Sequence, residues 1–202
     1  MNRIAEASLL RWGFVGTGGI ANAMASVVAT VPLAELRAVS SRRTKSANEF
    51  ADRYDVALRF DDWQAMLDSD DIDAVYVATP TSVREKISIA AADAGKHVLA
   101  EKPFASAASV KRIIEACRKN DVAFMDGTHF VHHPRHHSIK NGMAELVGNP
   151  WSGASAFQFG LWDRGDIRYN TELEPMGAIG DAGWYNMRAA LEYLSKDAAP
   201  VF

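Results

Sequence analysis

The chain has 202 residues, of which 48% are hydrophobic and 23% are charged. This composition predicts one large or two small globular domains with a real core, and it excludes disordered and collagen-like proteins. The formal net charge of -3 gives no bulk attraction for nucleic acid or for an anionic membrane. We therefore expect a small-molecule partner.

The expected location is cytoplasmic. Cys117 is the only cysteine, which excludes an internal disulfide framework and suits a reducing compartment. No apolar run approaches the roughly 18 residues that a membrane span needs. The N-terminal segment MNRIAEASLL lacks the long apolar stretch and cleavage site of a secretory signal peptide.

From Arg11 to about Gly127, short β-branched runs alternate with longer amphipathic stretches, which is typical of βαβ units and a parallel sheet. The run Ala74–Ala78 is almost wholly apolar, as a strand buried on both faces of a doubly wound sheet requires. We predict strands at residues 12–15, 36–40, 57–60, 74–78, 97–100 and 122–125. We predict helices at residues 20–29, 46–54, 63–68, 82–94 and 107–119, with Asp61 and Ser106 as N-caps.

After Asp126 the regular alternation stops. We predict a helix at Pro134–Leu146, an apolar strand at Ala154–Leu161 and, after a Gly-rich segment, an apolar helix that ends near Leu194. A domain boundary near Gly127 follows from this change, so that residues 1–127 form an α/β domain with a doubly wound parallel sheet.

A glycine-rich loop follows the first predicted strand and precedes the first predicted helix. Its spacing, G-x-G-x-x-A, is typical of a dinucleotide-binding loop in this context. Gly16 allows the tight turn, Gly18 lets the backbone approach a pyrophosphate, and Ala21 is small enough for helix and strand to pack. The helix N-terminus offers free N–H groups to phosphates. We therefore predict that residues 1–127 are a Rossmann NAD(P)-binding domain, in which the cofactor contacts Gly16, Thr17, Gly18, Gly19 and Ile20.

The end of the second predicted strand indicates which cofactor is preferred. An NAD-preferring site places Asp or Glu there, to accept a hydrogen bond from the ribose 2′-hydroxyl. This chain has Ser41, Arg42 and Arg43 instead, while Glu35 falls at the start of the strand. Hydroxyl and guanidinium groups suit a 2′-phosphate. We predict NADP, with NAD as the alternative cofactor, bound by Ser41, Arg42 and Arg43; the other reading is that both arginines are simply solvated.

Two further segments end predicted parallel strands, at the edge of the sheet where ligands bind. They are Thr79-Pro80-Thr81 and Glu101-Lys102-Pro103, and we predict cofactor contacts from Thr79, Pro80, Thr81, Glu101 and Lys102. Pro103 ends the strand and places the Lys102 ammonium near the expected nicotinamide end. Taken alone, a lysine before a proline is more often an ordinary loop residue.

Asp181 and Tyr185 lie at the start of the last predicted helix. If Asp181 opens this helix, Tyr185 lies four residues on and shares its face, with Gly183 leaving space between them. Both residues facing Lys102 would form a proton-transfer group. The alternatives are an N-cap role for Asp181 and a half-buried aromatic role for Tyr185.

Five of the six histidines fall between His129 and His137. Pro134 interrupts any helix through this cluster, and Asp126 is the one nearby acid that could complete a ligand set. We predict no metal here, and expect substrate-facing polar residues or a solvated helix start. A metal-dependent hydrolase is a third, weaker reading of the function.

The loop at Gly16, Glu101-Lys102-Pro103 and Asp181-x-Gly183-x-Tyr185 occur in this order. On these motifs the chain resembles the glucose-fructose oxidoreductase, inositol dehydrogenase and MocA family, from about Trp12 to its end. The stretch MDGTHFVHHPR and the segment Asp166-Ile167-Arg168 also resemble segments of NADP-dependent sugar and dihydrodiol dehydrogenases.

The resemblance implies hydride transfer between the nicotinamide and a carbinol or carbonyl carbon of a sugar, polyol or dihydrodiol. Lys102 would hydrogen-bond the substrate hydroxyl and the cofactor ribose, Tyr185 would act as acid and base, and Asp181 would orient the substrate. A neighbouring ammonium favours the tyrosine phenolate. His129 is placed with the substrate, and Arg168 is placed within reach of the cofactor or in a surface salt bridge.

Two departures from the family pattern matter. The family commonly has a histidine where this chain has Arg84. Family members also continue well beyond this length, into an open sheet that covers the active site and often mediates dimerisation. We therefore expect residues 128–202 to be a truncated α+β substrate domain, and the full-length protein to be a homo-oligomer. The alternative function, from a different class, is a catalytically inactive dinucleotide-binding regulatory protein or fragment.

Overall fold

The computed structural model describes residues 8–148 and 150–194. Contacts between Cα atoms divide the chain into two units, Met1–Asp126 and Gly127–Phe202. The division falls next to the boundary expected from the sequence.

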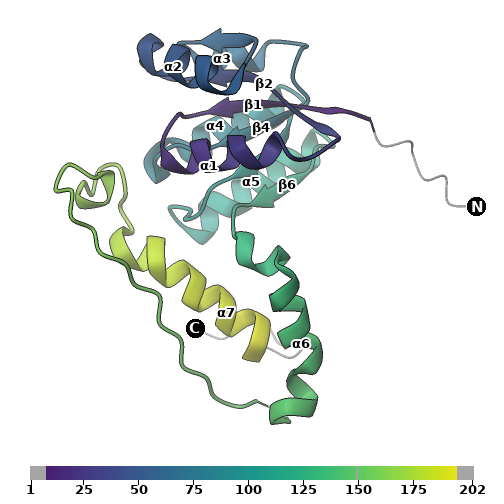
Figure 1. Cartoon of the computed structure of the whole chain (residues 1–202), viewed down its shortest axis with the longest axis vertical. Helices are drawn as coiled ribbons and strands as arrows, with labels where there is room; N and C mark the ends of the chain where they lie inside the picture. The colour runs from purple at the N-terminus through teal and green to yellow at the C-terminus, as the bar shows by residue number, and fades with distance from the viewer. Residues whose placement is uncertain (1–7, 149, 195–202) are drawn as a thin grey trace, which may run out of the picture. The chain divides into compact units, whose positions relative to one another are not determined.

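The first unit is built on a parallel six-stranded sheet with the order β3-β2-β1-β4-β5-β6 (Figure 1). This order is the doubly wound arrangement of a Rossmann fold, so the predicted fold class is confirmed. The strands are β1 (Leu10–Val15), β2 (Ala34–Ser40), β3 (Leu58–Phe60), β4 (Ala74–Val77), β5 (His97–Ala100) and β6 (Phe124–Asp126).

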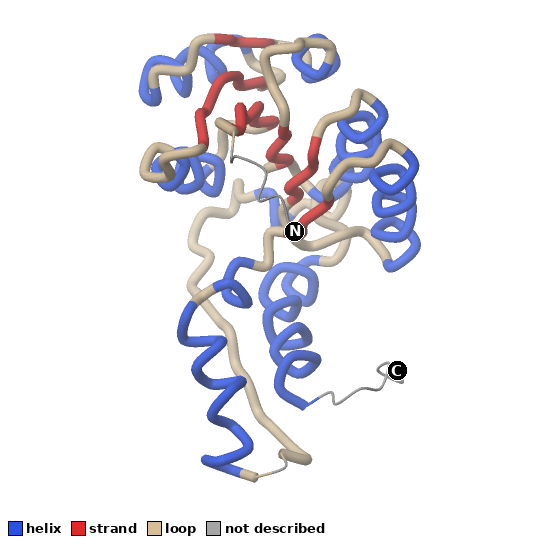
Figure 2. The backbone as a smooth tube through the Cα atoms, turned by 90° about the vertical axis from the view of Figure 1, so that its right-hand side faces the viewer, coloured by secondary structure: helices blue, strands red, loops and turns tan. Residues whose placement is uncertain are grey.

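Helices cover both faces of this sheet, as Figure 2 shows for the red strands between blue helices. Right-handed crossovers place α1 and α2 on one face and the other three on the opposite face, and α1 contacts α2 while α4 contacts α3 and α5. The helices are α1 (Gly19–Val28), α2 (Thr44–Tyr54), α3 (Trp63–Leu67), α4 (Thr81–Asp93) and α5 (Ala107–Lys119).

The core lies where β1 and β4 meet the helices. All four residues of β4 are buried, which explains its continuous apolar sequence. The ring of Phe14 packs 4.9 Å from that of Tyr76 and 6.4 Å from that of Phe50, measured between ring centres. Burying each such side chain stabilises the fold by about 1.5–3 kcal/mol.

The N-cap predictions are half right. Ser106 caps α5, because its side chain accepts a hydrogen bond from the Ser109 N–H. The prediction for Asp61 is wrong: Asp62 is the N-cap of α3 and accepts from the Gln64 N–H at 3.1 Å. Adjacent aspartates carry the same local signal, and the path of the chain selects between them.

The second unit contains η1 (His129–His132), α6 (Pro134–Val147), η2 (Ile167–Tyr169), the π-helical turn η3 (Ile179–Gly183) and α7 (Trp184–Leu194). The predicted strand at residues 154–161 is wrong, because a strand needs a neighbour to pair with and the described part of this unit contains none. Instead an irregular segment runs antiparallel to α7, with Gly153 near Leu194 and Phe157 near Tyr185. Within residues 8–148 and 150–194, no helix has the length and apolarity to cross a bilayer.

Candidate cofactor and active site

Gly16 makes the turn from β1 into the loop before α1. Its φ angle is +113°, in a region that residues with a side chain rarely adopt. A Cβ atom here would lie 2.5 Å from the carbonyl oxygen of Ala78, because β1 and β4 are neighbours in the sheet. Conformation and crowding both require glycine at this position.

The first turn of α1 follows the loop with uncapped N–H groups. Gly18 is the N-cap residue, and among the described residues no side chain caps the helix. A Cβ atom at Gly18 or Gly19 would meet no described atom within 4 Å, so packing inside the protein does not demand glycine there. This open space beside a helix N-terminus fits a pyrophosphate group. Ala21 is fully buried where α1 meets the sheet.

Asn22 holds the loop in place, a role that the sequence reasoning missed. Its Nδ2 donates to the carbonyl oxygens of Thr17 at 3.1 Å and Gly18 at 2.8 Å. Its Oδ1 accepts from Tyr54 Oη at 3.1 Å and from Arg53 Nη1 at 2.9 Å. The available signal is an asparagine inside a helix, where its amide competes for backbone groups and is normally unfavourable.

The residues predicted to bind a 2′-phosphate lie at the carboxyl end of β2. The Ser41 hydroxyl is 3.5 Å from the Thr17 hydroxyl, so this end of β2 adjoins the glycine-rich loop. Arg42 and Arg43 are exposed, and the first turn of α2 contains no acidic residue. Glu35 lies near the amino end of β2, as predicted. Exposed guanidinium groups beside the loop fit a phosphate.

Thr79 and Thr81 follow β4. The Thr79 hydroxyl is buried, and no described residue forms a hydrogen bond with it. Such a hydroxyl costs about 1–3 kcal/mol, which a ligand group could recover. Thr81 is buried at the start of α4, and its hydroxyl accepts from Arg84 Nη1 at 3.0 Å.

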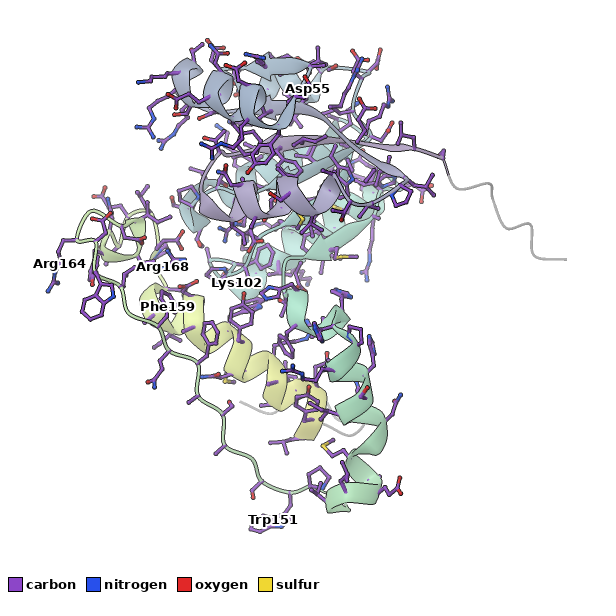
Figure 3. The ribbon with its side chains drawn as sticks, viewed as in Figure 1. Asp55, Lys102, Trp151, Phe159, Arg164 and Arg168 are labelled. Atoms are coloured by element: carbon purple, nitrogen blue, oxygen red, sulfur yellow. The ribbon has the colours of Figure 1, made fainter. Side chains whose placement is uncertain are left out.

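Lys102 follows β5 and is partly exposed (Figure 3). Glu101 beside it is buried and accepts a hydrogen bond from Tyr76 Oη at 2.6 Å, and the Lys102–Pro103 peptide is cis. Because β1, β4 and β5 are consecutive in the sheet, Gly16, Thr79 and Lys102 follow neighbouring strands at one edge. The structure therefore brings the predicted cofactor residues of the first unit together.

In the second unit, Arg168 binds Asp181. Its Nε lies 2.6 Å from Asp181 Oδ2, and its Nη1 lies 3.2 Å from Asp166 Oδ1. The guanidinium carbon is 5.6 Å from the centre of the Phe159 ring (Figure 3). Asp181 does not open α7, the condition on which its shared helix face with Tyr185 depended, because it lies inside the π-helical turn η3. Its carboxylate pairs with a guanidinium far back in the sequence, which no local pattern reveals.

Tyr185 lies in the first turn of α7 beside His129. The Tyr185 Oη is 3.4 Å from His129 Nδ1, and the Tyr185 ring centre is 4.9 Å from that of Phe157. Trp184 Nε1 donates to the buried hydroxyl of Thr128 at 2.7 Å, which ties α7 to the segment before η1. Two residues predicted to contact substrate, His129 and Tyr185, thus come together, and a phenol beside an imidazole can exchange a proton with it.

Two further histidines, His133 and His136, have structural roles within the second unit. Among the described residues, no group of His, Cys, Asp and Glu could hold a metal ion. His133 caps α6 by accepting from the Arg135 N–H at 3.0 Å. His136 is buried, with its Nδ1 2.9 Å from Tyr193 Oη and its Nε2 3.6 Å from Glu192 Oε2. His136 therefore joins α6 to α7.

Burial lowers the pKa of His136, although Glu192 acts in the opposite direction. The unfolded chain then binds more protons than the folded chain below about pH 6.5, so the second unit should lose stability as pH falls through that value. We expect amide exchange in α6 and α7, corrected for intrinsic rates, to be faster at pH 5.5 than at pH 7.5. His136→Gln should remove most of this difference, whereas exposed His132→Gln should keep it. Equal pH dependence in wild type and His136→Gln would contradict this assignment.

Comparison with known proteins places this architecture in a family. The Gfo/Idh/MocA family model, described as an oxidoreductase family with an NAD-binding Rossmann fold, matches residues 10–128. A dTDP-3,4-didehydro-2,6-dideoxy-α-D-glucose 3-reductase from Actinomadura kijaniata is 34% identical in an alignment of length 201 that covers 98% of this chain and 60% of the relative. A D-xylose 1-dehydrogenase (NADP⁺) from Haloferax volcanii is 32% identical over 92% of this chain and 57% of its own length.

A solved structure agrees with these sequence relationships. The 3-ketoreductase from Actinomadura kijaniata, crystallised with NADP and TDP-benzene, superposes with a TM-score of 0.87 at 33% identity. The superposition covers 92% of this chain and 57% of that protein, so this chain spans less than two thirds of its relative. The chain belongs to the Gfo/Idh/MocA family of oxidoreductases with an NAD-binding Rossmann fold.

Proposed function

We propose that this chain carries the cofactor site, and part of the substrate site, of an NADP-dependent oxidoreductase acting on a sugar-like alcohol or ketone. The observation that carries the proposal is the edge of the sheet where Gly16, Thr79 and Lys102 follow three neighbouring strands. The relatives support the cofactor, since one is named for NADP⁺ and another was crystallised with NADP. Oligomerisation of the complete protein remains a prediction.

The cofactor would be held along that edge. The loop and the N-terminus of α1 would bind the pyrophosphate, Arg42 and Arg43 would bind the 2′-phosphate, and Thr79 and Glu101 would contact the nicotinamide half. When bound, NADP(H) supplies the hydride acceptor or donor. The protein supplies orientation and proton transfer.

The roles at the substrate are proposed for each unit by itself. In the first unit, the Lys102 ammonium would donate a hydrogen bond to the substrate oxygen. In the second unit, the Tyr185 hydroxyl would exchange a proton with the substrate. His129, 3.4 Å from the Tyr185 hydroxyl, would return a proton to Tyr185 after reduction of a ketone, or accept one from Tyr185 after oxidation of an alcohol. Asp181, fixed by Arg168, would orient the substrate. We accordingly assign residues 128–202 to part of a substrate domain.

The experiment that tests the proposal combines binding and turnover. NADPH binding would be followed by fluorescence, and turnover with a dTDP-linked keto sugar, D-xylose, scyllo-inositol and a trans-dihydrodiol, compounds named for the relatives. We expect NADPH to bind and the dTDP-linked keto sugar to be reduced. Binding without turnover of any compound would favour the inactive binding protein, and absence of NADPH binding would contradict the proposal.

Cofactor preference gives a sharper prediction. Arg42→Ala should raise the Kd for NADP by about 10- to 100-fold, because a charge-assisted hydrogen bond to the 2′-phosphate contributes about 1.5–3 kcal/mol. The Kd for NAD should change by less than about twofold, since NAD has no 2′-phosphate. Lys45→Ala, an exposed cation on α2, serves as the matched control in the same titrations. Equal wild-type affinity for both cofactors would remove the basis for this prediction.

A further inference from the structure

Arg84 is a buried cation beside the carboxyl edge of the sheet. It lies in the first turn of α4 and its exposed fraction is 4%. Its Nη1 donates to the Thr81 hydroxyl at 3.0 Å and to the carbonyl oxygen of Pro103, and its Nη2 donates to the carbonyl oxygen of Thr79. One guanidinium group thus binds the segment after β4 and the segment after β5.

The hydrogen-bond acceptors around Arg84 explain why a buried positive charge is tolerated in this position. Peptide carbonyls beyond the end of a parallel strand leave the ladder and need another donor when they are buried. A buried guanidinium costs several kcal/mol unless its N–H groups are paired. Arginine carries five donors in a rigid fork, whereas a histidine ring has at most two. Arg84 can therefore reach acceptors on two segments that are distant in sequence.

Lys102 is fixed from both sides along the chain. On its N-terminal side, the buried Glu101 carboxylate accepts from Tyr76 of β4 at 2.6 Å. On its C-terminal side, the Pro103 carbonyl accepts from Arg84 of α4. Both hydrogen bonds connect the segment after β5 to β4 or α4, and Lys102 lies between the two bonded residues.

We infer that Arg84 is a positioning residue for the segments that carry Thr79, Glu101 and Lys102, acting by fixing the segment after β5 against the segment after β4. The inference rests on the proposed function, in that these two segments take the nicotinamide half of the cofactor while β1 and β2 take the adenosine half. A 4% exposed guanidinium that donates to two carbonyls and a hydroxyl is engaged within the protein, so its action on the cofactor passes through the segments it holds.

The test compares two ligands that share the adenosine half of the cofactor. NADPH contains both halves, whereas 2′-phospho-ADP-ribose lacks the nicotinamide. Arg84→Gln should raise the Kd for NADPH by about tenfold, the effect of one such charged hydrogen bond, and should leave the Kd for 2′-phospho-ADP-ribose within about twofold. Arg84→Lys, which keeps the charge, should restore part of the NADPH affinity. Arg112→Gln is the matched control. Arg112 is an exposed residue of α5, and it pairs with Glu85, the residue next to Arg84 on α4.

The outcomes separate positioning from general support. Equal loss of affinity for both ligands in Arg84→Gln would show loosening of the whole unit and would overturn the inference, as would unchanged NADPH affinity. Amide exchange without ligand gives a second readout: Arg84→Gln should accelerate exchange in residues 79–81 and 101–104, and Arg112→Gln should not. If wild type binds neither ligand, the proposed function fails. The amide-exchange result then tests by itself whether Arg84 holds the two segments together. Unchanged exchange in residues 79–81 and 101–104 of Arg84→Gln would overturn the inference.

Discussion

Replacing Lys102 with methionine is expected to lower kcat for NADPH-dependent reduction by about 10²- to 10³-fold, the usual effect of removing one hydrogen-bond donor to an oxygen on which negative charge develops. Methionine keeps much of the length of the side chain but has no N–H group to donate to the substrate oxygen. The Kd for NADPH should change only a few-fold, because the phosphate contacts belong to the loop at Gly16 and to the end of β2. Steady-state kinetics and fluorescence titration measure the two quantities separately.

The control for this variant is Lys111→Met. Lys111 is an exposed lysine on α5 that pairs with Glu115, so its loss should leave both kcat and NADPH affinity unchanged. If Lys102→Met keeps the wild-type kcat, Lys102 is an ordinary loop lysine and the proposed role is wrong. If NADPH binding disappears with the activity, Lys102 supports the cofactor site instead of donating a hydrogen bond to the substrate oxygen.

The second large effect is expected from alanine substitutions in the glycine-rich loop. Gly16→Ala should abolish measurable NADPH binding and lower Tm by several degrees, because it adds about 1–3 kcal/mol of backbone strain and a clash with the Ala78 carbonyl oxygen. Gly18→Ala should keep Tm, since its Cβ atom meets no described atom within 4 Å. It should still raise the Kd for NADPH by at least about tenfold, by filling space that the pyrophosphate needs.

Gly95→Ala separates conformation from crowding in this series. Gly95 also has a positive φ of +72°, but a Cβ atom there has no described neighbour within 4 Å, and the residue lies in the turn between α4 and β5. We expect a small loss of Tm and unchanged NADPH affinity from this control. Differential scanning fluorimetry and titration of the three variants would check the set, and wild-type affinity in Gly18→Ala would contradict the assignment of the loop.

Most of the first unit was predictable because its signals are local. A strand buried on both faces must be continuously apolar, so the composition of Ala74–Ala78 alone predicts β4. The G-x-G-x-x-A spacing fixes a strand, a turn and a helix together. Ser106 behaves as predicted for the same reason, since a cap bonds to N–H groups within its own turn.

Apart from the cap at Asp62 in place of Asp61, the features that the sequence did not predict depend on partners outside the local segment. Residues 154–161 have the apolar alternation of a strand, yet pairing depends on a neighbour that the described part of the second unit does not supply. Asp181 has the residue type of a cap, but its carboxylate pairs with Arg168. The role of Arg84 has no local signal, because only the sheet brings the carbonyls of Thr79 and Pro103 to the same place.

The π-helical turn at Ile179–Gly183 sets the direction of the side chains in the Asp181-x-Gly183-x-Tyr185 motif, which the spacing of the motif alone does not predict. A π turn holds more residues than an α turn, so it rotates everything after it relative to an uninterrupted α-helix, in which each residue advances by about 100°. Losing any one residue of this turn other than Asp181 would leave every functional side chain present while turning Tyr185 away from His129. Correspondence of residue types between two such chains is therefore insufficient, and the surplus residue in the helix is itself part of the site.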